Sequence, residues 1–171
     1  VVSIVGSILD DSIPGDPCAD MNGDGNVDVL DVVAIVGMIL DGRIMGDATE
    51  AQLNITNGYV SLEADGFIGA VQMTLNHGSD FSIELTNRAM VADYRTNDNS
   101  TTLIIVAPET EDLFAASSEF TIDEFIVLNS DSEIPVIMPA ELSLGKAYPN
   151  PFNPSTSLSL NLSADGFVNL A

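Results

Sequence analysis

The hydrophobic residues at the start of the chain fall into two nearly identical segments. Residues 1–11 read VVSIVGSILDD and residues 32–42 read VVAIVGMILDG, with eight of eleven aligned positions identical. A self-match this close over a helix-sized length indicates a duplicated unit. We therefore predict two similar helices. An acidic loop immediately precedes the second copy, so we expect the first copy to follow a loop of its own, before Val1.

From about residue 47 the hydrophobic pattern changes to a period of two, which predicts strands. The run LIIVA at 103–107 is continuously apolar, as expected for a strand buried on both faces, and FTIDEFIVL at 120–128 supplies one or two more strands. Asn-Gly, Asp-Gly and His-Gly pairs mark turns between the runs. We predict a small antiparallel β-sandwich over 47–138. The alternating apolar residues are Val60, Leu62 and Ala64, then Val71, Met73 and Leu75, then Phe81, Ile83 and Leu85.

A proline-rich stretch separates this region from the end of the chain. Residues 134–156 contain five prolines, which cannot donate to a ladder, so we place a domain boundary near Pro139. Beyond it, leucines at 158, 160 and 162 alternate with polar residues and predict the first strands of another β domain, over 139–171. LSADGFV at 162–168 echoes LEADGFI at 62–68, which we interpret as a shared Asp-Gly hairpin turn.

The charge of the chain limits the classes of partner that it can bind. A formal net charge of -22 rests on 26 acidic and only four basic residues, so nucleic acid and anionic membrane surfaces are poor partners. A hydrophobic content of 46% is nevertheless enough for a folded core. The apolar run at 32–40 is too short to span a bilayer, and no signal peptide is visible. The single cysteine, Cys18, is expected to be a small buried side chain.

The segment DMNGDGNVDVLD at 20–31 predicts a calcium site. Ca²⁺ takes six to eight oxygen ligands at flexible angles, whereas Mg²⁺ requires stricter octahedral geometry. Gly25, the sixth residue of the loop, permits the sharp turn between the ligands. Val27 is expected to point away from the ion. The candidate ligands are the side chains of Asp20, Asn22, Asp24, Asp28 and Asp31 and the backbone carbonyl of Asn26.

The loop and the duplicated helix resemble a type I dockerin over residues 1–44. DSIPGDPCA before the loop excludes an entering helix, so only the exiting helix VLDVVAIVGMILDG at 29–42 remains, unlike an ordinary EF-hand. The resemblance implies that calcium holds the fold and that the module docks onto a protein partner. Val29 and Leu30 replace the polar contact residues common in dockerins. We expect these two residues to pack against a neighbouring domain instead of recruiting a standard cohesin.

Two further resemblances concern the rest of the chain. GFIGAVQMTLNHGSDFSIEL is similar to early strands of a cohesin-like sandwich, over about 50–130. AYPNPFNPSTSLSLNL resembles the opening of the C-terminal Ig-like sorting domains carried by proteins of the type IX secretion system, over about 147–171. This second resemblance implies a bacterial protein that is secreted or held at the cell surface. The predicted fold class is thus multi-domain α+β, with modules at 1–44, 47–138 and 139–171.

The chain offers little for catalysis. The one histidine, His77, has no nucleophile marked by a motif, and we expect it to be an exposed turn residue. Matches to glycosylation patterns at Asn54, Asn99 and Asn161 and in DSI at 11–13 are short enough to arise by chance. We predict a non-enzymatic, calcium-stabilised extracellular module for adhesion or assembly, with the C-terminal strands joining subunits into a head-to-tail filament. The alternative is the accessory and sorting tail of a secreted hydrolase, a glycosidase or protease whose catalytic domain lies upstream.

Overall fold

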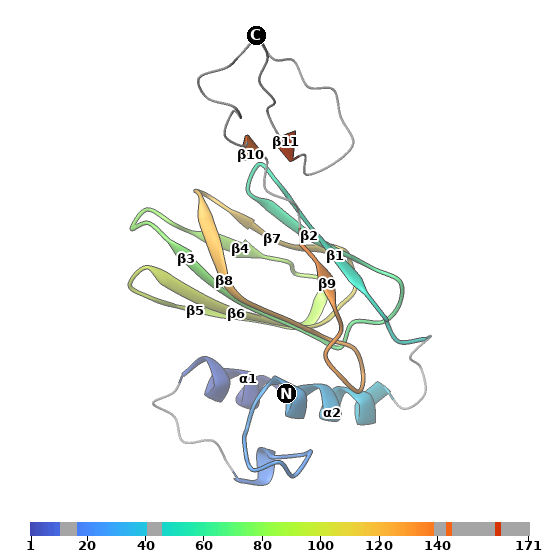
Figure 1. Cartoon of the computed structure of the whole chain (residues 1–171). Helices are drawn as coiled ribbons and strands as arrows, with labels where there is room; N and C mark the ends of the chain where they lie inside the picture. Colours follow the sequence, from blue (N-terminus) through green and yellow to red (C-terminus); the bar gives the residue numbers. More distant parts are fainter. Residues whose placement is uncertain (11–16, 41–45, 139–142, 145–159, 162–171) are drawn as a thin grey trace, which may run out of the picture. The chain divides into compact units, whose positions relative to one another are not determined.

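The computed structural model describes residues 1–10, 17–40, 46–138, 143–144 and 160–161. Val1–Ile137 form one compact unit, mostly β, with two sheets and two short helices (Figure 1). Met138–Ala171 form a second unit, in which β10 (Ser143–Leu144) pairs antiparallel with β11 (Leu160–Asn161). The proline-rich motif at 147–154 and the echo at 162–168 lie outside the described residues. The division into modules at 1–44, 47–138 and 139–171 stays a prediction.

Both predicted helices are confirmed. Helix α1 covers Val2–Leu9 and helix α2 covers Val29–Leu40. The equivalent residues of the repeat, Val5 and Val36, are both buried, at 0% and 1% exposure. Neither described helix has the length and apolar character that crossing a membrane requires.

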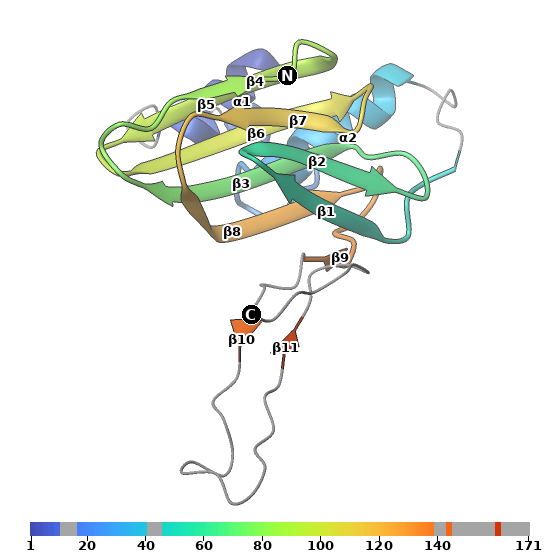
Figure 2. The same cartoon turned by 90° about the horizontal axis from the view of Figure 1, so that it is seen from above.

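The described strands of the first unit form a five-stranded and a four-stranded sheet. Their orders are β4-β7-β2-β1-β9 and β5-β6-β3-β8. Figure 2 shows β5 and β8 along opposite edges of the four-stranded sheet. The strands are β1 (Ala51–Thr56), β2 (Tyr59–Ala64), β3 (Ala70–His77), β4 (Ile83–Leu85), β5 (Ala89–Asn97), β6 (Ser100–Pro108), β7 (Asp112–Ala116), β8 (Phe120–Leu128) and β9 (Val136–Ile137).

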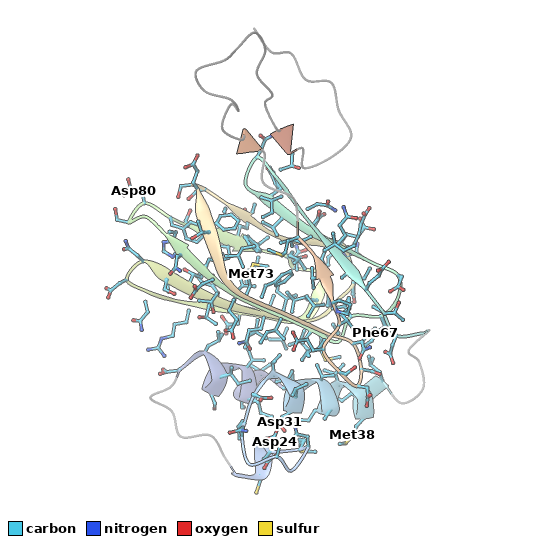
Figure 3. All side chains as sticks on the ribbon, in the orientation of Figure 1. Asp24, Asp31, Met38, Phe67, Met73 and Asp80 are labelled. Atoms are coloured by element: carbon cyan, nitrogen blue, oxygen red, sulfur yellow. The ribbon has the colours of Figure 1, made fainter. Side chains whose placement is uncertain are left out.

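The main core contains residues of both sheets, as the period-two pattern predicts. Leu53 and Val60 of the five-stranded sheet share it with Val71, Met73 and Leu75 of the four-stranded sheet. Met73 is fully buried, and Figure 3 labels it between the two sheets. Alternate residues along β3 therefore face this core.

The continuous apolar run in β6 is buried on both faces, which confirms the prediction for 103–107. Leu103 and Ile105 belong to the main core, whereas Ile104 and Val106 belong to a second core shared with both helices. All four are 0% exposed. The helices cover the outer face of the four-stranded sheet (Figure 1), so this sheet has apolar contacts on both sides.

Of two predicted turns, one is a hairpin and the other is not. The Asn57–Gly58 hairpin between β1 and β2 is confirmed, and both residues have positive φ, 52° and 82°. Asp65–Gly66 is not a hairpin turn, because β2 pairs with β1 and β7 while β3 pairs with β6 and β8. This pair instead carries the chain from one sheet to the other.

The sandwich is also not wholly antiparallel. Strand β9 runs parallel to β1, with Ala51 opposite Val136. Alternation of apolar residues fixes which face of a strand is buried but does not fix the direction of its neighbour.

Candidate metal centre

The acidic loop lies between a 3₁₀ turn at Pro17–Ala19 and the start of α2. Gly23 and Gly25 have φ values of +78° and +92°, a region that side-chain-bearing residues rarely adopt. The predicted sharp turn at Gly25 is therefore present.

Asp31 joins the two ends of the loop. Its side chain is 0% exposed, and its Oδ1 accepts hydrogen bonds from the backbone N–H of Met21 (2.6 Å) and Asn22 (3.2 Å). Its Oδ2 accepts the N–H of Asp28 at 2.8 Å. Burying a carboxylate is costly unless hydrogen bonds compensate it, and three N–H donors do so here.

Asp28 and Asp31 also cap α2. Asp28 Oδ1 accepts the N–H of Leu30 at 2.8 Å, which makes Asp28 the N-cap residue. Asp31 in turn accepts a hydrogen bond from the N–H of Asp28. It lies in the first helical turn, where negative charge is favourable. Sequence reasoning assigned these residues only to the metal. Their spacing of three, at the boundary of an apolar run, is the signal that would have revealed the cap.

Two further carboxylates of the loop, that of the half-buried Asp20 and that of the exposed Asp24, accept hydrogen bonds from nearby backbone groups. Asp20 accepts the N–H of Gly23 at 2.7 Å and of Gly25 at 3.0 Å through its two oxygens. Asp24 Oδ1 accepts the N–H of Asn26 at 2.8 Å. These bonds curl the backbone around the acidic side chains (Figure 3, Asp24 and Asp31).

Asn22 and Asp24 are linked to each other. The Asn22 amide donates to Asp24 Oδ2 at 3.0 Å, and Asn22 Oδ1 accepts the N–H of Asp24 at 2.9 Å. The N–H of Asn26 and the amide of Asn22 hold the pKa of Asp24 below its ordinary value, because both bonds favour the charged carboxylate. Asp24 is thus ionised at neutral pH.

Within the described residues, no three His, Cys, Asp or Glu side chains are arranged to hold a metal ion. The donor chemistry nevertheless fits a hard cation, since the candidate side chains offer only carboxylate and amide oxygens. The N–H bonds leave coordinating capacity, because each carboxylate oxygen has two lone pairs.

The apolar residues at the end of the loop are directed towards the sheet. Val29 is 4% exposed and belongs to the second core with Ile104 and Leu128. Leu30 is partly buried against the same core. The sequence predicts that both residues pack against a neighbouring domain; they pack on the four-stranded sheet, which lies in the same compact unit as the loop. Val27, expected to point inward, is half-buried.

The other candidate residues have structural surroundings. His77 is half-buried at the end of β3 and stacks on Phe81, with ring centroids 4.0 Å apart. Its Nε2 lies 2.8 Å from the Thr101 hydroxyl, and its Nδ1 lies 2.8 Å from the Gly78 carbonyl. The expectation of an exposed turn residue is therefore wrong. Cys18 is exposed, so the prediction that it is buried is also wrong.

Comparisons with protein-family models, curated proteins and solved structures found no match to this chain.

Proposed function

We propose that this chain is a calcium-stabilised, non-catalytic structural module that mediates protein–protein assembly outside the cell. The observation that carries the proposal is the connection of the acidic loop to the second core through Asp31. Its buried carboxylate ties the start of the loop to the first turn of α2. Helix α2 in turn packs on the four-stranded sheet.

Calcium has a clear physical role in this arrangement. Asp20, Asp24, Asp28 and Asp31 place four carboxylates within twelve residues, and like charges this close repel one another. A divalent cation held by these residues, with Asn22 and the carbonyl of Asn26, would offset that repulsion. Because the cation would bind only the folded loop, it would stabilise the attachment of α2.

The partner class and location rest on sequence motifs. The dockerin-like repeat at 1–44 supports docking onto a protein, and the motif at 147–154 supports export to the cell surface. A cohesin-like assignment of the sandwich belongs to the same proposal. Assembly into a head-to-tail filament through the C-terminal strands follows from strand addition to a neighbouring subunit.

Thermal unfolding in calcium and in EDTA tests the metal. An ion present at 100 times its dissociation constant stabilises the folded state by about 2.7 kcal/mol, so EDTA should lower the melting temperature by several degrees. A triple variant, Asp20→Asn, Asp24→Asn and Asp28→Asn, should lose this response. Three Asp→Asn changes at exposed residues outside the loop (Asp80, Asp98 and Asp123) form the charge-matched control and should keep it. An EDTA response that survives in the loop triple variant removes calcium from the account.

Light scattering tests the filament. We expect particles whose mass increases with concentration. These particles should disappear when residues 155–171 are deleted. A strictly monomeric chain in calcium would contradict the filament without affecting the calcium proposal.

The alternative assignment, a sorting tail of a secreted hydrolase, is favoured by the same motif at 147–154. Both assignments include a calcium ion held by the acidic loop. They differ in whether a catalytic domain lies upstream of Val1. A catalytic motif in the full reading frame would decide for the hydrolase.

A further inference from the structure

The four-stranded sheet has a long open edge at β5. Strand β5 has β6 on one side, and no described strand pairs with its other side. The N–H of Tyr94 donates to Asp93 Oδ1 at 2.8 Å instead of to β6, so it faces the open side. Backbone groups alternate in direction along a strand, so residues 92 and 96 face the same way. This edge can accept another strand.

The side chains of β5 carry both signs of charge. Asp93 and Arg95 are two positions apart and therefore lie on one face of the sheet. Arg95 forms an ion pair with Asp10 and remains 43% exposed. Its guanidinium has five N–H donors, so it can contact a second carboxylate as well.

We propose that β5 pairs antiparallel with β5 of a second copy of this chain, with the two-fold axis at Tyr94. In this register Asp93 lies directly opposite Arg95 of the second copy, and Arg95 opposite its Asp93. Two complementary pairs form at once, because an isologous contact repeats every interaction. The two four-stranded sheets become continuous.

Other registers lack this complementarity. An axis at residue 93 places the two Asp93 carboxylates opposite each other, and an axis at 95 does the same for the two arginines. The other open edge, β8, carries Asp123 and Glu124 and no cation, so self-pairing there brings only like charges together. Charge complementarity therefore selects β5 and selects the second copy as its occupant.

The exposed residues of β5 agree with this contact. Tyr94 is 43% exposed, although large hydrophobic side chains are normally buried, and the axis places it opposite Tyr94 of the second copy. In the monomer, the Asp93 carboxylate occupies the outward N–H of Tyr94. On pairing, the N–H of Tyr94 donates instead to a backbone carbonyl of the second copy. The Asp93 carboxylate is then free to face Arg95 of the second copy.

Charge exchange tests the register, with sedimentation equilibrium at physiological salt as the readout. The wild-type chain should show a dimerisation step within its concentration-dependent association, up to millimolar concentration. Asp93→Arg should weaken the dimer about tenfold, a loss of about 1.4 kcal/mol. This loss occurs even though the change reduces the net charge of -22, which would otherwise favour association. Arg95→Asp should weaken the dimer as well.

The double variant Asp93→Arg, Arg95→Asp should restore the dimer, because each pair is re-formed with its signs exchanged. It also lacks the Arg95–Asp10 ion pair, so its recovery separates the contact between copies from that internal one. Glu124→Arg, the same change of charge on β8, is the control and should leave dimerisation unchanged. Circular dichroism confirms that each variant is folded.

A wild-type chain that stays monomeric overturns the proposal. So does Asp93→Arg dimerising as well as wild type, or a folded double variant that stays monomeric. An open-ended filament through the C-terminal strands would persist in Asp93→Arg, so the two assemblies fail independently.

Discussion

In the sandwich, residues far apart along the chain are neighbours, whereas in the acidic loop the neighbours are local. Met73 of β3 pairs with Leu103 on one side and Phe125 on the other. Among the described residues, the side-chain bonds of the loop connect residues at most ten positions apart, as from Met21 to Asp31. Apolar burial thus holds the sandwich, and carboxylates accepting N–H groups hold the loop.

Helix α2 belongs to both regions. Its first turn is capped by Asp28 and Asp31, while Val33 and Val36 lie in the second core. Helix α2 is thus held by apolar burial on the sheet side and by carboxylates on the loop side.

The largest effects are expected in the two cores. Leu103→Ala opens a cavity between the sheets, and Ile104→Ala opens one under the helices, since these neighbours face opposite sides. Each should lower the free energy of unfolding by about 2 to 5 kcal/mol, measured by urea denaturation. Ile104→Ala should also reduce hydrogen-exchange protection in α2 more than in β3. A loss under about 1 kcal/mol for Ile104→Ala would contradict the packing of the helices on the sheet.

Loss of the Asp31 carboxylate should have the next largest effect. Asp31→Ala leaves three N–H groups without their acceptor, which should cost about 3 kcal/mol in calcium-free buffer. Asp28→Ala removes the acceptor of one N–H, that of Leu30, and should cost about 1 kcal/mol. Chemical denaturation of both variants checks the ranking. Equal losses would mean that Asp31 does not join the ends of the loop.

Adding a Cβ to one glycine in each region compares how closely the backbone is packed there. A Cβ on Gly58 would lie 2.6 Å from the Ala116 carbonyl oxygen, whereas one on Gly25 would meet nothing within 4 Å. Both residues have positive φ. Gly25→Ala should therefore cost about 1 kcal/mol from φ alone, and Gly58→Ala roughly 2 to 3 kcal/mol. Thermal unfolding measures both, and a smaller effect at Gly58 than at Gly25 would contradict the close approach.

The smallest effect concerns pH. The Thr49 hydroxyl, followed by the N–H groups of Thr49 and Glu50, lowers the pKa of Asp65 from its ordinary value of 3.8. A carboxyl whose folded pKa is depressed stabilises the fold above its unfolded pKa and loses that contribution as pH falls through its folded pKa. Asp65→Asn should thus flatten the fall in melting temperature below about pH 4. Asp123→Asn, an exposed control, should not, and identical slopes in the two variants would contradict the account.

Much of the fold follows from local patterns. The helical repeat, the Asn57–Gly58 hairpin and the two-sided burial of 103–107 all depend on neighbouring residues, so the sequence predicts them. The sheet crossing at Asp65–Gly66 and the parallel pairing of β9 depend on which distant strands close the sheet. Alternation of apolar residues does not specify that choice.

The candidate site divides in the same way. Residue types and spacing identify the acidic loop and its hard-oxygen donors. They do not reveal that Asp31 is buried, because its burial depends on how the start of the loop folds over it, where the N–H groups of Met21 and Asn22 bond to its carboxylate. The exposure of Cys18 likewise depends on how the 3₁₀ turn lies on the folded unit.

We propose that calcium acts on the loop and on α2, and not on the sandwich directly. Hydrogen exchange in calcium and in EDTA measures this residue by residue. We predict that calcium increases the protection of amides in 20–31 and at the start of α2 by a larger factor than in β3 and β6. Equal protection of the loop with and without calcium would contradict the account.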